Sequence, residues 1–181
     1  MPEVKAYEPP AERLETSVNI SDEDELEEFK EITLNEECSA IFTHQTPSKM
    51  NNMMILSTSC MIKDYTIDKI LCDPSLHMNF ISLEFVKKLD LRKVKPSNII
   101  LRLANGRVQY PWGLIRDVIV KIDKLEFIID FQVIDNESEY VVLSKPFLDT
   151  SRSLINIEKC TLTFRKMEKE VVIQVYNLKS K

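Results

Sequence analysis

An acidic residue at the end of a strand-like run is the strongest candidate for chemistry in this chain. Residues 65–73 contain Ile67, Ile70 and Leu71 and end on Asp73, which predicts a strand that delivers a carboxylate into a turn. A second apolar run, 140–143, follows about seventy residues later. A carboxylate held rigidly in such a place could act as a general acid or base. A carboxylate in an ordinary surface turn is the alternative for Asp73 taken alone.

Other reactive side chains lack the pattern that their chemistry requires. Asp73, Ser75 and His77 invite a Ser-His-Asp triad, but three neighbours on one turn seldom reach the geometry that a triad needs. The two histidines have no ligand spacing to cysteine pairs, so no zinc site is predicted. The chain has no P-loop, no dinucleotide-binding fingerprint and no basic-aromatic stripe. We therefore expect no metal, no organic cofactor and no direct contact with nucleic acid.

Charge divides the 181 residues into two parts. Residues 1–40 contain thirteen acidic and three basic residues, whereas residues 41–181 contain sixteen acidic and twenty-one basic residues. The sequence therefore predicts an acidic arm, about residues 1–50, on a mildly basic domain at 51–178. Within the arm, residues 1–20 are expected to be disordered, residues 21–32 to form a short helix capped by Ser21, and residues 35–52 to be a linker.

The compartment is predicted from the cysteines and from hydropathy. The four cysteines form no C-x-x-C pair, no apolar signal segment opens the chain, and no apolar run approaches the length of a membrane span. These features predict a cytoplasmic or nuclear protein that is neither secreted nor bound to a membrane. Cys72 is expected to be a small buried side chain rather than a reactive one.

Short strand-like runs fill the chain from residue 53 onwards and predict an all-β barrel or sandwich. They lie at 53–62, 65–72, 99–103, 107–110, 115–122, 126–134, 140–143, 154–157, 161–165 and 170–176. Alternation with a period of two predicts that the odd positions 127–133 share one buried face, as do the even positions 118–122. One helix is predicted at 82–89 and a helical turn at about 148–151. Asn105-Gly106 predicts a type I′ hairpin turn.

From about Met53 to Val175 the chain resembles the retropepsin-like aspartic protease domain of plant gypsy-type LTR retrotransposon polyproteins. The matching motifs are Leu71-Cys72-Asp73, Asn79, Leu103-Ala104-Asn105-Gly106, Tyr110-Pro111-x-Gly113, Phe131-x-Val133-Ile134, Lys145-Pro146-Phe147-Leu148 and Ile155-x-Ile157-Glu158. The resemblance implies a retropepsin-like barrel with one or two short helices. It also implies a host gene or fragment derived from such an element.

The resemblance further implies peptide-bond hydrolysis by a homodimer. Two carboxylates that share one proton supply both the acid and the base, and a single chain provides only Asp73 for this role. The hairpin would be the flap over a peptide or polyprotein substrate, with Ala104, Asn105, Gly106, Tyr110 and Trp112 at the groove. Trp112 could instead pack within its own hairpin. The second loop of the site would contain Leu143, Ser144 and Lys145.

The departures from the family pattern fall in the active-site loop. Pro74 has neither a hydroxyl nor an N–H for the hydrogen bonds that lock two such loops together. Ser75 replaces a glycine, so its Cβ could crowd the loop or change its dihedral angles. Leu76 enlarges an alanine position, and His77 replaces a small hydroxyl residue.

The second loop departs as well, since Ser144 replaces a glycine and Lys145 replaces an arginine. Lysine keeps the charge but lacks the planar two-pronged donor of arginine. Together these changes favour a retained fold with impaired catalysis. Two hypotheses stay open: a homodimeric aspartic endopeptidase, and a non-catalytic dimerisation or peptide-binding module with the same fold.

Overall fold

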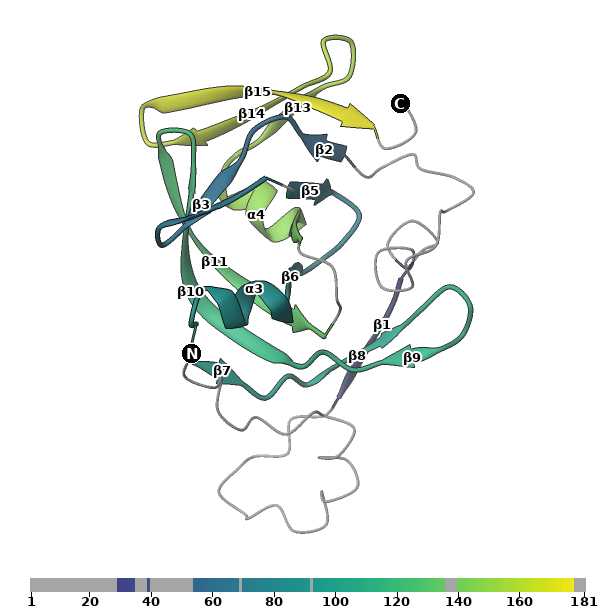
Figure 1. Ribbon diagram of the computed structural model, residues 1–181. Helices are drawn as coiled ribbons and strands as arrows, with labels where there is room; N and C mark the ends of the chain where they lie inside the picture. The colour runs from purple at the N-terminus through teal and green to yellow at the C-terminus, as the bar shows by residue number, and fades with distance from the viewer. Residues whose placement is uncertain are drawn as a thin grey trace, which may run out of the picture.

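A computed structural model describes residues 29–34, 39, 54–68, 70–91, 93–135 and 140–177. These residues form many short strands and two short helices, as the sequence predicted (Figure 1). The elements are β1 (Lys30–Thr33), β2 (Met54–Leu56), β3 (Cys60–Ile62), β4 (Tyr65–Ile67), β5 (Ile70–Asp73), β6 (Asn79–Ser82), α3 (Leu83–Lys88), β7 (Val94–Lys95), β8 (Ile99–Arg102), β9 (Val108–Gln109), β10 (Gly113–Ile122), β11 (Leu125–Ile134), β12 (Val141–Ser144), α4 (Lys145–Thr150), β13 (Leu154–Asn156), β14 (Thr161–Lys166) and β15 (Lys169–Asn177). No helix in this described part of the chain has the length and apolar character to cross a membrane.

Most of the described strands join one curled sheet. Its order is β13-β14-β15-β2-β5-β12-β6-β11-β10-β3-β4, and β7 also pairs with β10. The pairs β5–β12 and β6–β11 are parallel, whereas β6–β12 is antiparallel. A smaller sheet, β1-β8-β9, lies below β5 and β6 in Figure 1. The parallel pairs therefore bring β5 and β12, which are distant in the sequence, side by side.

The central strands have two buried faces, which pack into two apolar clusters. Successive side chains of a strand point to opposite faces. The main core contains Ile70 and Cys72 of β5, whereas Leu71 belongs to the second cluster. In β12, Leu143 likewise packs in the main core, whereas Val142 packs in the second cluster. The second cluster is completed by side chains of the smaller sheet, so it joins the two sheets.

Three aromatic rings fasten helix α4 to the main core. The ring of Phe147 meets that of Phe127 edge-on at 5.0 Å between centroids and that of Phe164 at 5.2 Å. Such pairs contribute about 0.5–1.5 kcal/mol each beyond their buried area. The cluster links β11, α4 and β14, and so fixes the position of the helix that follows Ser144.

The predicted strand faces are confirmed, but two predicted strands are each divided. The side chains of Phe127, Ile129, Phe131 and Val133 are buried, as are those of Val118, Val120 and Ile122. The run 53–62 becomes β2 and β3, because β2 pairs with β15 and β5 while β3 pairs with β10 and β4. The run 65–72 divides into β4 and β5 for the same reason, since its two halves have different partner strands.

The turn at Asn105 and Gly106 is a hairpin turn of a different type from the one predicted. Gly106 has a φ of +86°, but Asn105 is not among the residues with positive φ, so the turn is not type I′. The Gly106 N–H donates to the Leu103 carbonyl at 2.9 Å, and the Leu103 N–H donates to the Arg107 carbonyl at 2.8 Å. This pattern is a three-residue loop that ends in a glycine bulge, which also requires positive φ only at the glycine.

Both helices lie close to their predicted positions in the sequence, with small shifts in where they begin and end. Helix α3 agrees with the prediction for 82–89, although the Ser82 side chain makes no cap bond to it. Instead the Ser82 hydroxyl accepts the Tyr140 N–H at 3.4 Å. Helix α4 begins at Lys145, three residues earlier than predicted, with Pro146 in its first turn. Proline is well suited to that position, because the first N–H groups of a helix have no partner within it.

The helix predicted at 21–32 is wrong for its last three residues, which belong to β1. Strand β1 pairs in parallel with β8, and Ile32 packs against the second apolar cluster. Tertiary pairing therefore overrides a weak local helix signal. Phe29, the residue before β1, is not helical either. Residues 21–28 of the predicted helix, residues 1–20, for which disorder was predicted, and all of the predicted linker 35–52 except Ser39 lie outside the described residues.

Candidate active site

Asp73 lies at the carboxyl end of β5, where the sequence placed it. The parallel register pairs Asp73 with Ser144 at the end of β12. Because side chains alternate along a strand, Asp73 shares the face of Leu71 and therefore points toward the second apolar cluster. Its side chain is buried, with a residue exposure of 0%. The candidate catalytic carboxylate thus lies between the large sheet and the smaller sheet.

The loop after Asp73 forms a tight turn to which proline is well adapted. The Leu76 N–H donates to the Asp73 carbonyl at 3.3 Å, which closes a four-residue turn with Pro74 at its second position. The ring of proline presets the φ that this position requires. Ser75 is not among the residues with positive φ, so its Cβ introduces no left-handed backbone strain. The residues of this loop therefore suit the turn that they form.

Ser75 binds the Asp73 carboxylate directly. Its backbone N–H donates to Asp73 Oδ1 at 2.8 Å, and its hydroxyl donates to the same oxygen at 2.6 Å. The hydroxyl proton of Ser75 is thus directed to Asp73 rather than to His77, which is an exposed residue. This geometry does not support a Ser-His-Asp triad. It does orient the carboxylate and engage one of its two oxygens.

Two hydrogen bonds connect the first loop to the second. The Lys145 N–H donates to the Leu76 carbonyl at 3.0 Å. The Ser144 N–H donates to Asn79 Oδ1 at 2.7 Å, and Asn79 Nδ2 donates to the Asp130 carbonyl at 3.2 Å. Asn79 is buried and bridges β12 to β11. In the sequence, Asn79 matches the family pattern but has no predicted role in the site. Its role depends on hydrogen-bond partners in two other strands, which the sequence does not reveal.

The hydroxyl of Ser144 is buried without a hydrogen-bond partner among the described residues. Its neighbour Leu143 is completely buried in the main core and faces away from Asp73. A buried polar group without a partner loses hydration that nothing replaces. Ser144 therefore places an energetically costly hydroxyl opposite the candidate catalytic residue.

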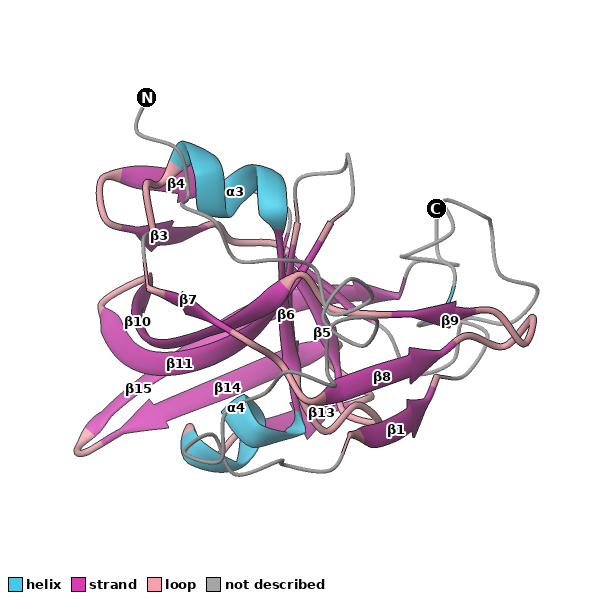
Figure 2. Cartoon of the chain, turned by 90° about the horizontal axis from the view of Figure 1, so that it is seen from below, coloured by secondary structure: helices cyan, strands magenta, loops and turns pink. Residues whose placement is uncertain are grey.

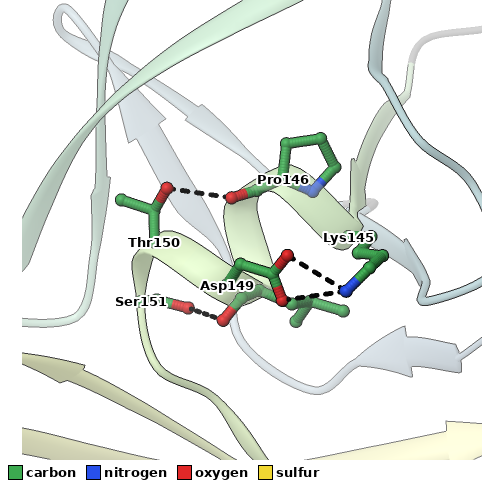
Figure 3. Close-up of polar contacts among 6 residues, drawn as sticks. Lys145, Pro146, Asp149, Thr150 and Ser151 are labelled. Atoms are coloured by element: carbon green, nitrogen blue, oxygen red, sulfur yellow. Dashed lines mark hydrogen bonds and ion pairs between the residues drawn. The ribbon is translucent and has the colours of Figure 1, made fainter.

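Lys145 directs its charge into its own helix. Its Nζ lies 3.2 Å from Asp149 Oδ1 and 3.1 Å from Asp149 Oδ2, as Figure 3 shows. In the same helix the Thr150 hydroxyl donates to the Pro146 carbonyl at 2.9 Å. Exposed pairs of this kind contribute little to stability. The Lys145 side chain consequently pairs with a residue of α4 itself.

The predicted flap residues divide between an exposed tip and a packed base. Ala104, Asn105 and Gly106 are exposed at the tip of the β8–β9 hairpin. Tyr110 is half-buried, whereas Trp112 packs against the main core. The packing of Trp112 supports the hypothesis that it fills space rather than covers a peptide.

A cavity of about 400 Å³ borders the loop after Asp73 and helix α4. Its walls include His77, Met78, Asn79, Pro146, Phe147 and Thr150, and Asp73 is not among them. His77 thus belongs to this cavity rather than to the surroundings of the carboxylate.

Burial accounts for the titration of the cysteine next to the site. Burial raises the pKa of the Cys72 thiol to about 12, and the charge of Asp73 adds to the rise. Burial likewise raises the pKa of Cys60 to about 12. Both thiols are therefore neutral side chains of the core at physiological pH. In the described ranges, no group of three or more His, Cys, Asp or Glu side chains could hold a metal ion.

Residues 39–170 match the family model described as retroviral aspartyl protease. The match covers most of the chain, and the chain therefore belongs to this family. No curated protein matches it.

Two solved structures are similar to this chain. The retroviral protease-like domain of Ddi1 from Leishmania major is similar with a TM-score of 0.54, at 16% identity over 72% of this chain and 99% of that chain. A retropepsin-like aspartic protease from Rickettsia conorii is 18% identical over 74% of this chain and 97% of that chain, with a TM-score of 0.37. The first likeness supports the predicted fold class, a retropepsin-like barrel with two short helices.

Proposed function

We propose that this protein is a homodimeric retropepsin-like domain that binds extended peptides beside Asp73 and hydrolyses them poorly. The observation that carries the proposal is the position of Asp73, completely buried at the end of β5 and in register with Ser144. A twofold axis next to this carboxylate would bring two copies of it together. We also infer descent from a gypsy-type retroelement, supported by the sequence motifs around the hairpin and α4.

In the dimer, one Asp73 would be protonated and the other ionised, because two adjacent like charges cannot both persist. The ionised carboxylate would take a proton from a water molecule, whose oxygen attacks the peptide carbonyl carbon. The protonated carboxyl would donate its proton to the carbonyl oxygen. Collapse of the resulting intermediate, with protonation of the amide nitrogen, breaks the C–N bond. The reaction needs no metal or organic cofactor.

Two features of the loop support impaired turnover. Both donors of Ser75 bind Asp73 Oδ1, so they compete with a water or a second carboxylate for that oxygen. Pro74 has no N–H or hydroxyl with which to bind the opposite loop in a dimer. A displacement near 1 Å at reacting atoms can cost roughly 100-fold in rate.

The test combines cleavage with oligomeric state. The full chain is incubated with a peptide library between pH 3.5 and 7, with and without pepstatin, beside Asp73→Asn. We expect weak, pepstatin-sensitive cleavage that Asp73→Asn abolishes and that Pro74→Thr with Ser75→Gly increases at least tenfold. Sedimentation of the same samples should show a dimer. A strictly monomeric chain would refute the paired carboxylates, and a dimer that cleaves nothing even with both loop changes would favour the non-catalytic peptide-binding alternative.

A further inference from the structure

Strand β1 covers the free edge of the β8–β9 hairpin. It pairs in parallel with β8, from Lys30 opposite Ile99 to Thr33 opposite Arg102. The Lys30 N–H donates to the Asn98 carbonyl at 2.8 Å. Figure 2 shows β1 along one side of β8 and β9 along the other. A segment from far earlier in the chain thus makes the main-chain hydrogen bonds that an added peptide strand would make.

The end of this segment enters the apolar cluster next to Asp73. Leu34 is only 2% exposed and its N–H donates to the Arg102 carbonyl at 2.8 Å. The same cluster contains Leu71, two residues before Asp73, and Leu76, whose N–H binds the Asp73 carbonyl. Leu34 therefore packs in the apolar surroundings of the candidate catalytic carboxylate.

Polar contacts join this part of the chain to the loop end of the hairpin. Glu31 forms an ion pair with Arg102, the last residue of β8, and the hydrogen bond from this guanidinium lowers the pKa of the Glu31 carboxyl. Near the hairpin tip, the Ser39 hydroxyl accepts the Ala104 N–H at 2.8 Å. The ion pair is exposed and contributes little. The buried Leu34 is therefore the contact on which docking depends most.

We propose that the edge of β8, together with the apolar cluster beside Asp73, is a binding site for an extended peptide, and that residues 30–34 occupy it as an intramolecular inhibitor. Strand addition supplies main-chain hydrogen bonds that accept many sequences, while alternate side chains provide selectivity. Ile32 and Leu34 lie two residues apart and both contact the cluster, whereas Thr33 is exposed. The ligand class is thus a peptide with aliphatic side chains at alternate positions.

An external peptide would have to displace a segment that is always close by. A tethered segment competes at an effective concentration that reaches the millimolar range for short linkers. The protein would therefore bind and process peptides weakly until residues 30–34 leave the hairpin. This inference rests on the proposed function in taking Asp73 to mark the groove, but its test requires no peptide cleavage.

The experiment compares full-length chains that differ in one residue of the segment. Leu34→Asp places a charge at the buried position, and the matched control Thr33→Asp places the same charge at the exposed neighbouring position. The probe is a fluorescent peptide with the sequence of residues 29–35, and its binding is measured by anisotropy. We expect Leu34→Asp to bind the probe roughly 10- to 100-fold more tightly than the wild type or Thr33→Asp, because the docked leucine no longer competes. A probe with aspartate in place of its leucine should not bind.

Hydrogen exchange on the same proteins gives a second measurement. The Leu34 amide should be protected in the wild type and in Thr33→Asp, and should exchange at least tenfold faster in Leu34→Ala, a milder variant that guards against unfolding. Equal probe affinity for all variants, or an unprotected Leu34 amide in the wild type, would overturn the proposal. Protection that rises with protein concentration would also overturn it, because a second copy would then supply the strand. If the chain binds the probe as expected but cleaves no peptide, this inference stands and the proposed peptidase activity is refuted.

Discussion

Asp73 and Ser144 lie opposite each other at the ends of two parallel strands, in contrasting polar surroundings. Asp73 Oδ1 accepts two hydrogen bonds from Ser75, while the Ser144 hydroxyl has no partner among the described residues. The Asp73 side chain is fixed by its hydrogen bonds, whereas burial of the Ser144 hydroxyl costs free energy of folding. The contrast identifies Ser144 as a position where a substitution should improve stability.

We expect Ser144→Ala to raise the free energy of unfolding by roughly 1 kcal/mol, because it removes a buried hydroxyl that has no partner. Urea denaturation at pH 7 measures the change. The matched control is Ser57→Ala at an exposed serine, which should alter stability by less than about 0.5 kcal/mol. A loss of stability in Ser144→Ala would show that the Ser144 hydroxyl forms a stabilising hydrogen bond.

Asn79→Ala should destabilise the protein by about 2–3 kcal/mol, because the buried Ser144 N–H would lose its acceptor. The Ser144 amide should also lose protection from hydrogen exchange. Asn156→Ala is the control, since Asn156 likewise accepts a backbone N–H, from Lys159 at 2.9 Å, but is exposed. Equal losses in the two variants would contradict a bridging role for Asn79.

Phe147→Ala should cost about 3–5 kcal/mol, since it opens a cavity between two other rings in the core. Phe147→Leu fills most of that space and should cost clearly less. Thermal and urea unfolding measure both variants. Ile157→Ala, at a side chain that is 87% exposed, should leave stability almost unchanged. A small effect of Phe147→Ala would mean that α4 is not anchored by the aromatic cluster.

Iodoacetamide at pH 8 should modify Cys160 at least roughly 100-fold faster than Cys60 or Cys72. Cys160 is exposed, whereas the thiols of Cys60 and Cys72 are buried and their pKa is raised to about 12. Mass spectrometry of tryptic peptides after timed labelling follows each site separately. In urea the three rates should converge, and equal rates in the native protein would contradict the burial of β3 and β5.

Stability should fall as pH rises from about 9 toward 12. The thiols of Cys60 and Cys72 ionise near their ordinary pKa of 9.0 when unfolded, but their pKa is about 12 in the folded protein. The folded state therefore binds more protons in this range, and each thiol lowers stability by at most about 1.4 kcal/mol per pH unit. The double variant Cys60→Ala and Cys72→Ala, melted beside the wild type, should show a shallower decline. Parallel declines would contradict the raised pKa values.

The loop after Asp73 shows how a sequence can leave a side-chain contact unpredicted. The sequence alone indicated that Pro74 could not donate to an opposing loop. It also predicted that Ser75 could crowd the turn or change its dihedral angles, whereas in the structure Ser75 donates two hydrogen bonds to the carboxylate. That bond depends on the turn closed between Asp73 and Leu76, which side-chain identity does not reveal.

Local patterns in the sequence determined the strand-rich class, the buried faces of β10 and β11, helix α3 and the strand end that presents Asp73. These features depend on alternation and turn chemistry, which act over a few residues. Only the tertiary structure decided that β1 is a strand, that Asn79 bridges two strands and that Leu34 packs beside the Asp73 loop. Their partners lie dozens of residues away, and pairing across such distances is set by the packing of the whole sheet rather than by local preference.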